Sequence, residues 1–224
     1  MKKMSKKIVM NVMLISIGVV MMEAGTQAYE RETVRYNCIK EVSNENWEIK
    51  SHITTSGNVS DETIEKVCSI IKTKVKREAY NYLANSGGRI IIVEGSDIKE
   101  YILSHYSCEK AREVKTAIMG YAPYFKNDDG ILQKVDVIIA SDCLDSLEHE
   151  FNHVLDYSHN YSSSAEFQKL YENTDGSMIF PDEQDRAYYM GQATEFFAEC
   201  ATMYMNNELT GKYPELEKYF SSIL

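Results

Sequence analysis

The stretch EHEFNHVLDY, residues 148–157, places two histidines four positions apart. Residues with that spacing lie one above the other on an α-helix, so His149 and His153 share a face, and Glu150 directly follows the first. The neighbouring apolar residues recur at helical spacing on another face: Leu144, Leu147, Phe151, Val154 and Leu155. We therefore expect a helix over 143–157 that presents both imidazoles rather than burying them among leucines.

Two imidazoles on one helix face can bind one metal ion, and a carboxylate beside them can reach a water next to that ion. This is the physical basis of the HExxH pattern of zinc peptidases, although an ordinary charged surface helix can also contain it. A catalytic zinc site usually takes three protein ligands. His159 is a poor third ligand, because it follows His153 by six residues and lacks the HExxHxxGxxH spacing.

A stretch further along the chain offers the missing ligand. ATEFFAECATMYM, residues 193–205, carries Glu195 and Glu199 four positions apart on one helical face, while its aromatic residues point mainly elsewhere. If this helix faces the first, one carboxylate can bind the metal ion and the other can hold a ligand histidine in place. The alternative for Glu199 is a solvated or salt-bridged side chain.

Together, HEFNHVLDY (149–157) and YYMGQATEFFAEC (188–200) resemble the catalytic domain of anthrax lethal factor and the small secreted Pro-Pro endopeptidases related to it. The resemblance covers residues 114–224 and is faint before them. It implies a zincin-like metallopeptidase that binds one Zn²⁺ per chain through three side chains: His149, His153 and Glu195.

The same resemblance implies two catalytic residues. Glu150 corresponds to the general base, and Tyr188, seven residues before the third ligand, corresponds to the tyrosine that donates a hydrogen bond to the oxyanion. The adjacent Tyr189 leaves this assignment open by one residue, and a purely packing role for Tyr188 is the alternative. Asn152 stands where lethal factor has glycine, and we expect it to face solvent or a loop. Asp156, three residues past the second histidine, is expected either to support a ligand or to be an ordinary surface aspartate.

The rest of the chain predicts an α+β fold. We expect a small mixed sheet packed on the HExxH helix and on the C-terminal helices. The predicted helices are 60–83, capped by Ser60, a short one within 96–113, 164–173, 192–206 and 214–223. The predicted strands are 89–93, 116–125 and 132–140, the last two joined by a turn at 126–130. Residues 181–189 are expected to form a loop. One of the stretches 116–124 and 133–140 is expected to bind substrate as an added strand.

The first 28 residues are expected to be a secretory signal peptide. A basic start, fifteen largely apolar residues (8–22) and the stretch EAGTQA precede cleavage after Ala28. An uncleaved anchor is the alternative, but fifteen helical residues span about 22 Å, less than the roughly 30 Å of a hydrocarbon core. The mature chain, 29–224, is then expected to be one secreted metallopeptidase domain whose residues 29–57 are a poorly defined lead-in.

The net charge and apolar pattern limit the possible binding partners, and the cysteine content leaves the disulfide state open. The whole chain has a formal net charge of −10, and without the leader the surplus of acids grows, so binding to nucleic acid is not expected. The mature chain has no second apolar stretch of spanning length, so we expect no stable membrane association, and we expect a monomer. Its five cysteines can form one or two disulfides or remain free thiols, and the sequence does not distinguish these cases.

These features predict a secreted zinc-dependent endopeptidase that acts on peptides or proteins. Two alternatives remain at this point. The chain can be the catalytic subunit of a toxin that is delivered into host cells, or a secreted zinc-binding protein on a peptidase scaffold. The presence of Glu150 disfavours the second alternative, because a binding module has no use for a base beside the metal ion.

Overall fold

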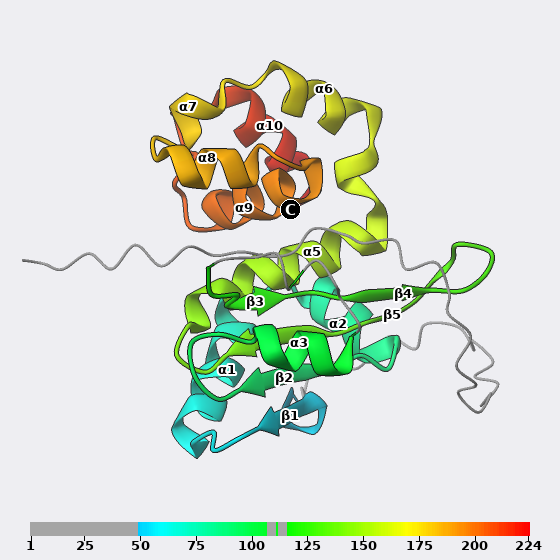
Figure 1. Cartoon of the computed structure of the whole chain (residues 1–224). Coiled ribbons are helices and arrows are strands. Elements are labelled where there is room, and N and C mark those ends of the chain that lie inside the picture. The colour runs from blue at the N-terminus through cyan, green and yellow to red at the C-terminus, as the bar shows by residue number, and fades with distance from the viewer. Residues whose placement is uncertain (1–48, 107–110, 112–115) are drawn as a thin grey trace, which may run out of the picture.

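The computed structural model describes residues 49–106, 111 and 116–224, and it combines a small mixed sheet with helices (Figure 1). The strands are β1 (Ile53–Ser56), β2 (Ile90–Val93), β3 (Gly120–Tyr121), β4 (Tyr124–Lys126), β5 (Leu132–Val135) and β6 (Val137–Ala140). The α-helices are α1 (Asp61–Lys74), α2 (Arg77–Asn85), α3 (Lys99–His105), α5 (Leu147–His159), α6 (Ala165–Asn173), α7 (Gly176–Ile179), α8 (Glu183–Tyr189), α9 (Ala193–Met205) and α10 (Pro214–Ile223). Short 3₁₀ turns are η1 (Ile49–His52), η2 (Leu144–Ser146) and η3 (Tyr161–Ser163).

The main sheet has the strand order β1-β2-β6-β3. The pairs β1–β2 and β2–β6 are parallel, whereas β3 runs antiparallel to β6 and forms the edge of the sheet. Strands β4 and β5 form a separate antiparallel hairpin. Among the described residues, β6 is paired on both sides, whereas β3 is paired only with β6 and β5 only with β4, so these two strands have an edge that an added strand could use.

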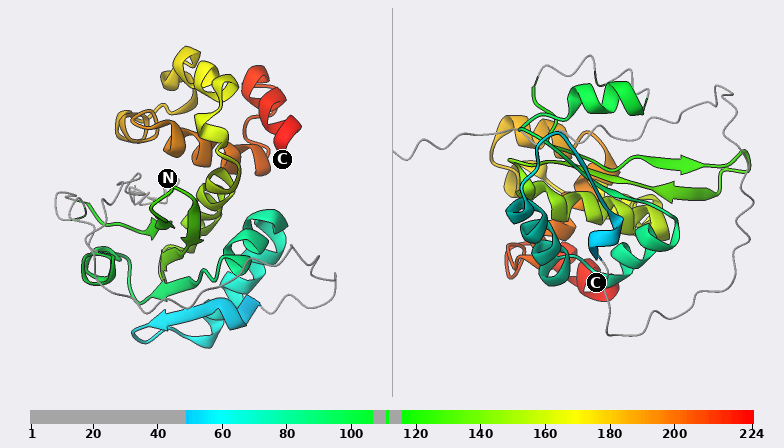
Figure 2. Two further views of the ribbon diagram at one scale, coloured as in Figure 1. Left: turned by 90° about the vertical axis from the view of Figure 1, so that its right-hand side faces the viewer. Right: turned by 90° about the horizontal axis from the view of Figure 1, so that it is seen from below.

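Helices cover both faces of the sheet (Figure 2). Successive side chains of a strand point to opposite faces, so Ile90 and Ile92 of β2 pack in the cluster formed with α1, α2 and α5. Ile91 and Val93 pack in a second cluster, with Ile98 and Ile102 on the side of α3. All four residues of β2 are buried, which is why this strand reads as a continuous apolar run.

Helix α5 lies between the sheet and the C-terminal helices (Figures 1 and 2). Every residue from Leu147 to Asp156 is buried. On its other side, α6 to α10 form a third apolar cluster built around Phe167, Phe196 and Phe220. The predicted α+β class, with a small mixed sheet on the HExxH helix, is confirmed.

The predicted helix 60–83 is two helices. Ser60 caps the first as expected, since its side chain accepts a hydrogen bond from the Thr63 N–H at 3.1 Å. The chain is extended at Val75 and Lys76, between α1 and α2. Val75 is buried in the cluster under the sheet, so tertiary packing interrupts a stretch whose local sequence favours a continuous helix.

Each of the predicted strands 116–125 and 132–140 is also divided. Pro123 has no N–H to donate to a ladder, and its carbonyl accepts from the Asp136 N–H at 3.0 Å. The Asp136 carboxylate in turn accepts from the Arg89 N–H at 2.9 Å. These contacts hold the two strands where the β4–β5 hairpin leaves the main sheet. The turn at 126–130 is confirmed, with Gly130 at φ 75°.

The remaining predictions divide into three groups. Helices α6, α9 and α10 confirm the predictions 164–173, 192–206 and 214–223, and β2 confirms the strand at 89–93. The loop expected at 181–189 is wrong, because α8 forms there with Asp182 as its N-cap, accepting from the Gln184 N–H at 2.8 Å. The leader and most of the lead-in lie outside the described residues. Within those residues the cysteines at 68, 143 and 200 are free thiols.

Candidate metal centre

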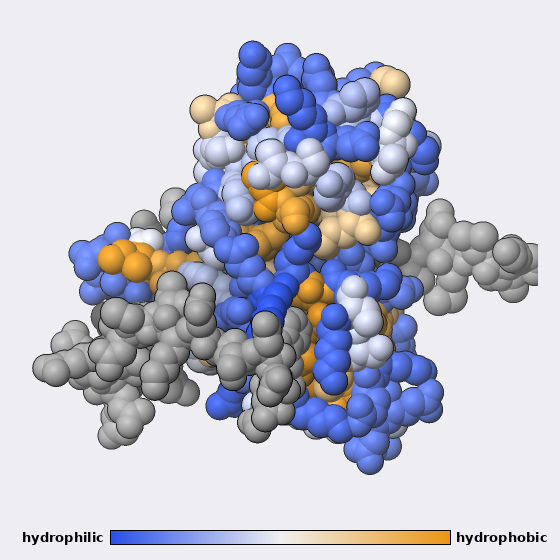
Figure 3. Space-filling view, turned by 180° about the vertical axis from the view of Figure 1, so that it is seen from behind, coloured by the Kyte–Doolittle hydropathy of each residue, from blue (hydrophilic) through white to orange (hydrophobic). Residues whose placement is uncertain are grey.

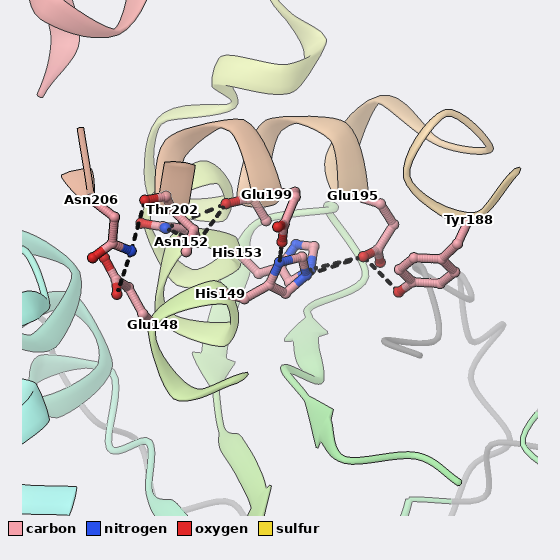
Figure 4. Close-up of polar contacts among 10 residues, drawn as sticks. Glu148, His149, Asn152, His153, Tyr188, Glu195, Glu199, Thr202 and Asn206 are labelled. Carbon is pink, nitrogen blue, oxygen red and sulfur yellow. Dashed lines mark hydrogen bonds and ion pairs between the residues drawn. The ribbon is translucent and has the colours of Figure 1, made fainter. Parts of the chain in front are cut away.

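Helix α5 holds His149 and His153 with their Nε2 atoms 3.1 Å apart. Each residue is only 2% exposed. Helix α9 covers that face of α5 and directs acidic side chains toward the histidines. The two rings are therefore buried against carboxylates rather than among leucines (Figure 4).

Helix α9 brings Glu195 to both histidines. One of its carboxylate oxygens, Oε2, lies 3.3 Å from Nε2 of His149 and 3.4 Å from Nε2 of His153. Glu195 is 1% exposed, and its other oxygen, Oε1, is buried without a hydrogen-bond partner among the described residues. Burial acts to raise the pKa of Glu195, but the two histidines outweigh it and lower the pKa to about 2.

Glu199, one turn further along α9, contacts the other nitrogen of His149. Its Oε2 lies 3.0 Å from Nδ1. Because an ionised carboxylate can only accept, Nδ1 donates, and in the neutral ring this leaves Nε2 unprotonated and able to bind a metal ion. In the metal-free site, burial lowers the pKa of His149, but the hydrogen bonds to Glu195 and Glu199 outweigh burial and raise it to about 10.

The three donor atoms suit one metal ion. The ligand atoms of His149, His153 and Glu195 all lie within 4.8 Å of one another, and all three residues are buried. A tetrahedral ion with bonds of about 2.1 Å places neighbouring ligand atoms about 3.4 Å apart. The contacts of 3.1, 3.3 and 3.4 Å between the donor atoms are close to that separation. Two imidazole nitrogens and one carboxylate oxygen form a donor set of the kind found in catalytic zinc sites.

Glu150 lies on α5 beside this triangle and is fully buried, at 0% exposure. Strand β3 passes directly over it. A Cβ atom placed on Gly120 would lie 2.3 Å from Oε1 of Glu150, closer than real carbon and oxygen atoms approach. A glycine at this position therefore leaves the space that the carboxylate occupies at the sheet edge.

Helix α8 supplies two tyrosines with different surroundings. The Tyr188 hydroxyl donates to Oε2 of Glu195 at 2.7 Å, the oxygen that also faces both histidines (Figure 4). Tyr189 is buried, with its ring 5.9 Å from the ring of His149, and burial together with the nearby Glu199 raises its pKa. Of the two residues, Tyr188 is the one whose hydroxyl contacts a candidate metal ligand.

Two further residues have other contacts than expected. Asp156 is buried, and its oxygens accept from the backbone N–H and the hydroxyl of Ser162, each at 2.6 Å, at the turn that follows α5. Asn152 does not face solvent or a loop. It is 2% exposed, and its amide donates to the Thr202 hydroxyl at 2.9 Å, which joins α5 to α9.

Comparison with known proteins places these features in a family. The model of one family, described as anthrax toxin lethal factor, N- and C-terminal domain, matches residues 39–219, most of the chain. The chain belongs to the anthrax toxin lethal factor family. The resemblance carried by the two motifs is thus confirmed, and the match begins much nearer the N-terminus than the motifs indicate. No curated protein matches the chain.

The fold is shared with a solved relative of known architecture. The Pro-Pro endopeptidase PPEP-2 from Paenibacillus alvei matches 79% of this chain and 99% of its own length, with a TM-score of 0.57 and 15% sequence identity. This likeness shows the fold, in agreement with the zincin-like expectation. Across the described residues of this family member, no helix combines the length and apolar character needed to span a membrane.

Sequence reasoning missed two residues of the site. Gly120 stands in an unremarkable strand pattern, and only the course of β3 over α5 shows why a side chain does not fit there. Asn152 departs from the glycine of lethal factor, but its partner Thr202 is 50 residues away in the sequence. The available signal was Asn152 itself, a polar residue in the middle of a helix that is otherwise buried. Buried amides normally have hydrogen-bond partners, so a partner on another element could have been expected.

Proposed function

We propose that this chain is a zinc-dependent endopeptidase. The observation that carries the proposal is the buried triangle of His149, His153 and Glu195, with Glu150 beside it on α5. Two imidazoles and one carboxylate are a ligand set that catalytic zinc takes while it keeps one position open. Membership of the lethal factor family and the fold shared with a Pro-Pro endopeptidase support peptide bonds as the substrate.

In the proposed reaction, His149, His153 and Glu195 would hold a zinc ion, which would supply a Lewis acid for the scissile carbonyl and lower the pKa of a water beside it. Glu150 takes a proton from that water and later delivers it to the leaving amine. Glu199 holds His149 in the tautomer whose Nε2 can bind the metal. Tyr188 donates a hydrogen bond to the oxyanion that forms on the carbonyl oxygen, a contact worth about 2.7–4 kcal/mol of transition-state stabilisation in a comparable case.

We further propose that the enzyme is exported as residues 29–224, forms a single domain, and acts as a monomer on peptides or proteins. The leader pattern of residues 1–28 and the acidic charge support this part of the proposal. N-terminal sequencing of the protein recovered from the culture medium of the expressing cells checks the export. A mature chain that begins at Tyr29 is expected, and a protein retained in the membrane with its leader contradicts it.

Cleavage of a mixed peptide library by the purified mature chain, followed by mass spectrometry, tests the activity. The untreated enzyme is expected to cleave, a chelator to abolish cleavage, and zinc added back to restore it. Cleavage that persists after complete metal removal contradicts the zinc mechanism. A chain that binds one zinc ion yet cleaves no peptide of the library contradicts the endopeptidase.

A further inference from the structure

A cavity adjoins the metal centre at the C-terminal end of α5. Its volume is about 550 Å³, enough for more than one amino-acid side chain. The β4–β5 hairpin, the end of α5 with the turn that follows, and the beginning of α9 supply most of its lining, and Tyr82 of α2 and Gln168 of α6 complete it. The hairpin projects from the body, to the right in Figure 1 and to the left in Figure 3. It exposes the apolar Phe125 and Ile131.

Two lining residues connect the cavity to the candidate metal ligands. The ring of Tyr157 stacks on that of His153, with centroids 5.9 Å apart and planes at 17°. Thr194 directly precedes Glu195. The ring of Tyr157 therefore separates a group in the cavity from the metal centre. Since each extended residue spans roughly 3.3–3.6 Å, the cavity can hold a substrate side chain about two residues from the scissile bond.

The lining is polar and rich in hydrogen-bond donors. Beside the tyrosines, the lining includes residues with hydroxyl or amide side chains: Ser158, Asn160, Ser162, Ser163, Gln168, Gln192 and Thr194. Three of them, Ser158, Ser162 and Gln168, already donate within the protein. The hydroxyl oxygen of Thr194 is buried and has no hydrogen-bond partner within the described part of the chain. A buried hydroxyl without a partner costs free energy, so a bound acceptor group would complete its hydrogen bonding.

The charges around the cavity favour an anion. Lys126 is the cation among its described lining residues, with Nζ 5.0 Å from the centre of the Tyr124 ring, which also lines the cavity. Helix α9 begins here, and no side chain caps its first turn, so its N-terminal amides add a partial positive charge. The lining acid, Asp156, already accepts two hydrogen bonds from Ser162.

We propose that this cavity is a substrate subsite that selects a carboxylate near the scissile bond. The carboxylate would accept hydrogen bonds from Thr194 and from the first turn of α9, and it would lie near the ammonium group of Lys126. This inference rests on the proposed peptidase activity. It adds a preference for aspartate or glutamate in the substrate, or for a free C-terminal carboxylate, at a fixed distance from the cleaved bond.

The test compares cleavage profiles of the metal-loaded mature enzyme on one peptide library, with free and with amidated C-termini. Peptides that carry glutamate at one position should be cleaved about tenfold faster than their glutamine counterparts, the size of one charge-assisted contact. A preference that survives amidation assigns the site to an acidic side chain, and one that amidation removes assigns it to the chain terminus.

Two variants and a control separate the subsite from general effects. Lys126→Glu and Thr194→Val should each reduce the glutamate-to-glutamine ratio severalfold. Lys72→Glu, the same charge change on an exposed position of α1, should leave the ratio unchanged. Cleavage by the wild type without a preference for carboxylate at any position, or a preference that both variants retain, overturns the subsite. Absence of cleavage by the wild type overturns the proposed function itself, and with it the subsite.

Discussion

Gly120 is the residue that leaves space for the Glu150 carboxylate. In a Gly120→Ala variant the new methyl group meets Oε1 of Glu150, and the flexible carboxylate must move away. Because a positioned general base contributes about 10²–10⁴-fold, we expect kcat to fall by about 100-fold, while one zinc ion per chain is retained. Steady-state kinetics together with metal analysis measure both effects.

Gly130→Ala is the matched control for that variant. Gly130 has φ 75° in the hairpin turn, and nothing lies within 4 Å of the position its Cβ would take. Its replacement should cost roughly 1 kcal/mol of stability from backbone strain and leave kcat within about twofold. Equal losses of activity in the two variants would mean that Gly120 acts only through the fold.

Glu199 fixes the ring of His149 and not the metal ion directly. Glu199→Gln removes the charge that holds the Nδ1 proton, so zinc affinity should fall by about 10–100-fold without loss of folding. Competition with a chromogenic chelator measures the affinity. Glu208→Gln, an exposed residue just past α9, is the control, and an unchanged affinity for Glu199→Gln would contradict the assigned contact.

Zinc binding to the metal-free protein should release protons. His149 has a pKa of about 10 in that state and holds a proton at pH 7, whereas Glu195, with a pKa of about 2, is already ionised. We expect about one proton released from His149 per zinc ion and an affinity that falls about tenfold per pH unit below neutrality. Calorimetry at pH 7 in buffers of different ionisation enthalpy counts the protons, and zero release contradicts this pairing.

At the residue scale, the sequence identified the residues now seen around the metal centre because helical spacing relates them locally. His149 and His153 are one turn apart, and so are Glu195 and Glu199, so each pair could be recognised without knowing the fold. The contacts of Gly120, Asn152 and Asp156 depend on elements distant in the sequence or on a turn. No local periodicity encodes those contacts.

At the scale of elements, the pairing of α5 with α9 sets the distance between histidines and carboxylates. Asn152 donates to Thr202 across this pair, and both groups lie in the helix interface. Asn152→Ala should cost about 1–3 kcal/mol of stability and also weaken zinc binding, because α9 loses one of its fixed points on α5. Thr202→Val removes the other partner of the same hydrogen bond.

A double-mutant cycle isolates the contact. The free energy of unfolding, measured by denaturant titration, should fall less in the double variant than the sum of the two single losses, by about 0.5–3 kcal/mol. Strict additivity would show that the hydrogen bond between α5 and α9 contributes nothing to their pairing.

The errors in predicting elements have physical causes. The split between α1 and α2 follows from burial of Val75, which overrides a local preference for helix. The prediction of a loop in place of α8 neglects Pro181 and Asp182, which with the following Glu183 form a recognisable helix start. The missed helix matters, because α8 directs Tyr188 to Glu195.

At the scale of the whole molecule, the architecture explains why a polar site can be buried so deeply. Helix α5 carries apolar residues into the core under the sheet and polar residues toward α9, so one helix serves both the fold and the site. Helical periodicity predicted this division, the order of the predicted elements indicated the α+β class, and the resemblance to lethal factor implied the zincin-like fold. The cavity beside α5 could not be predicted in this way, since several elements distant from one another in the sequence form it.

Replacement of Glu150 by glutamine in the mature chain tests the central claim most directly, with Glu148→Gln alongside. Both glutamates are buried on α5, but Glu148 contacts Asn206 at 3.2 Å and Lys74 at 3.7 Å, away from the metal centre. We expect Glu150→Gln to keep one zinc ion per chain and lose at least about 10³-fold in peptide cleavage, while Glu148→Gln keeps most activity. Undiminished cleavage by a zinc-loaded Glu150→Gln enzyme would contradict the account.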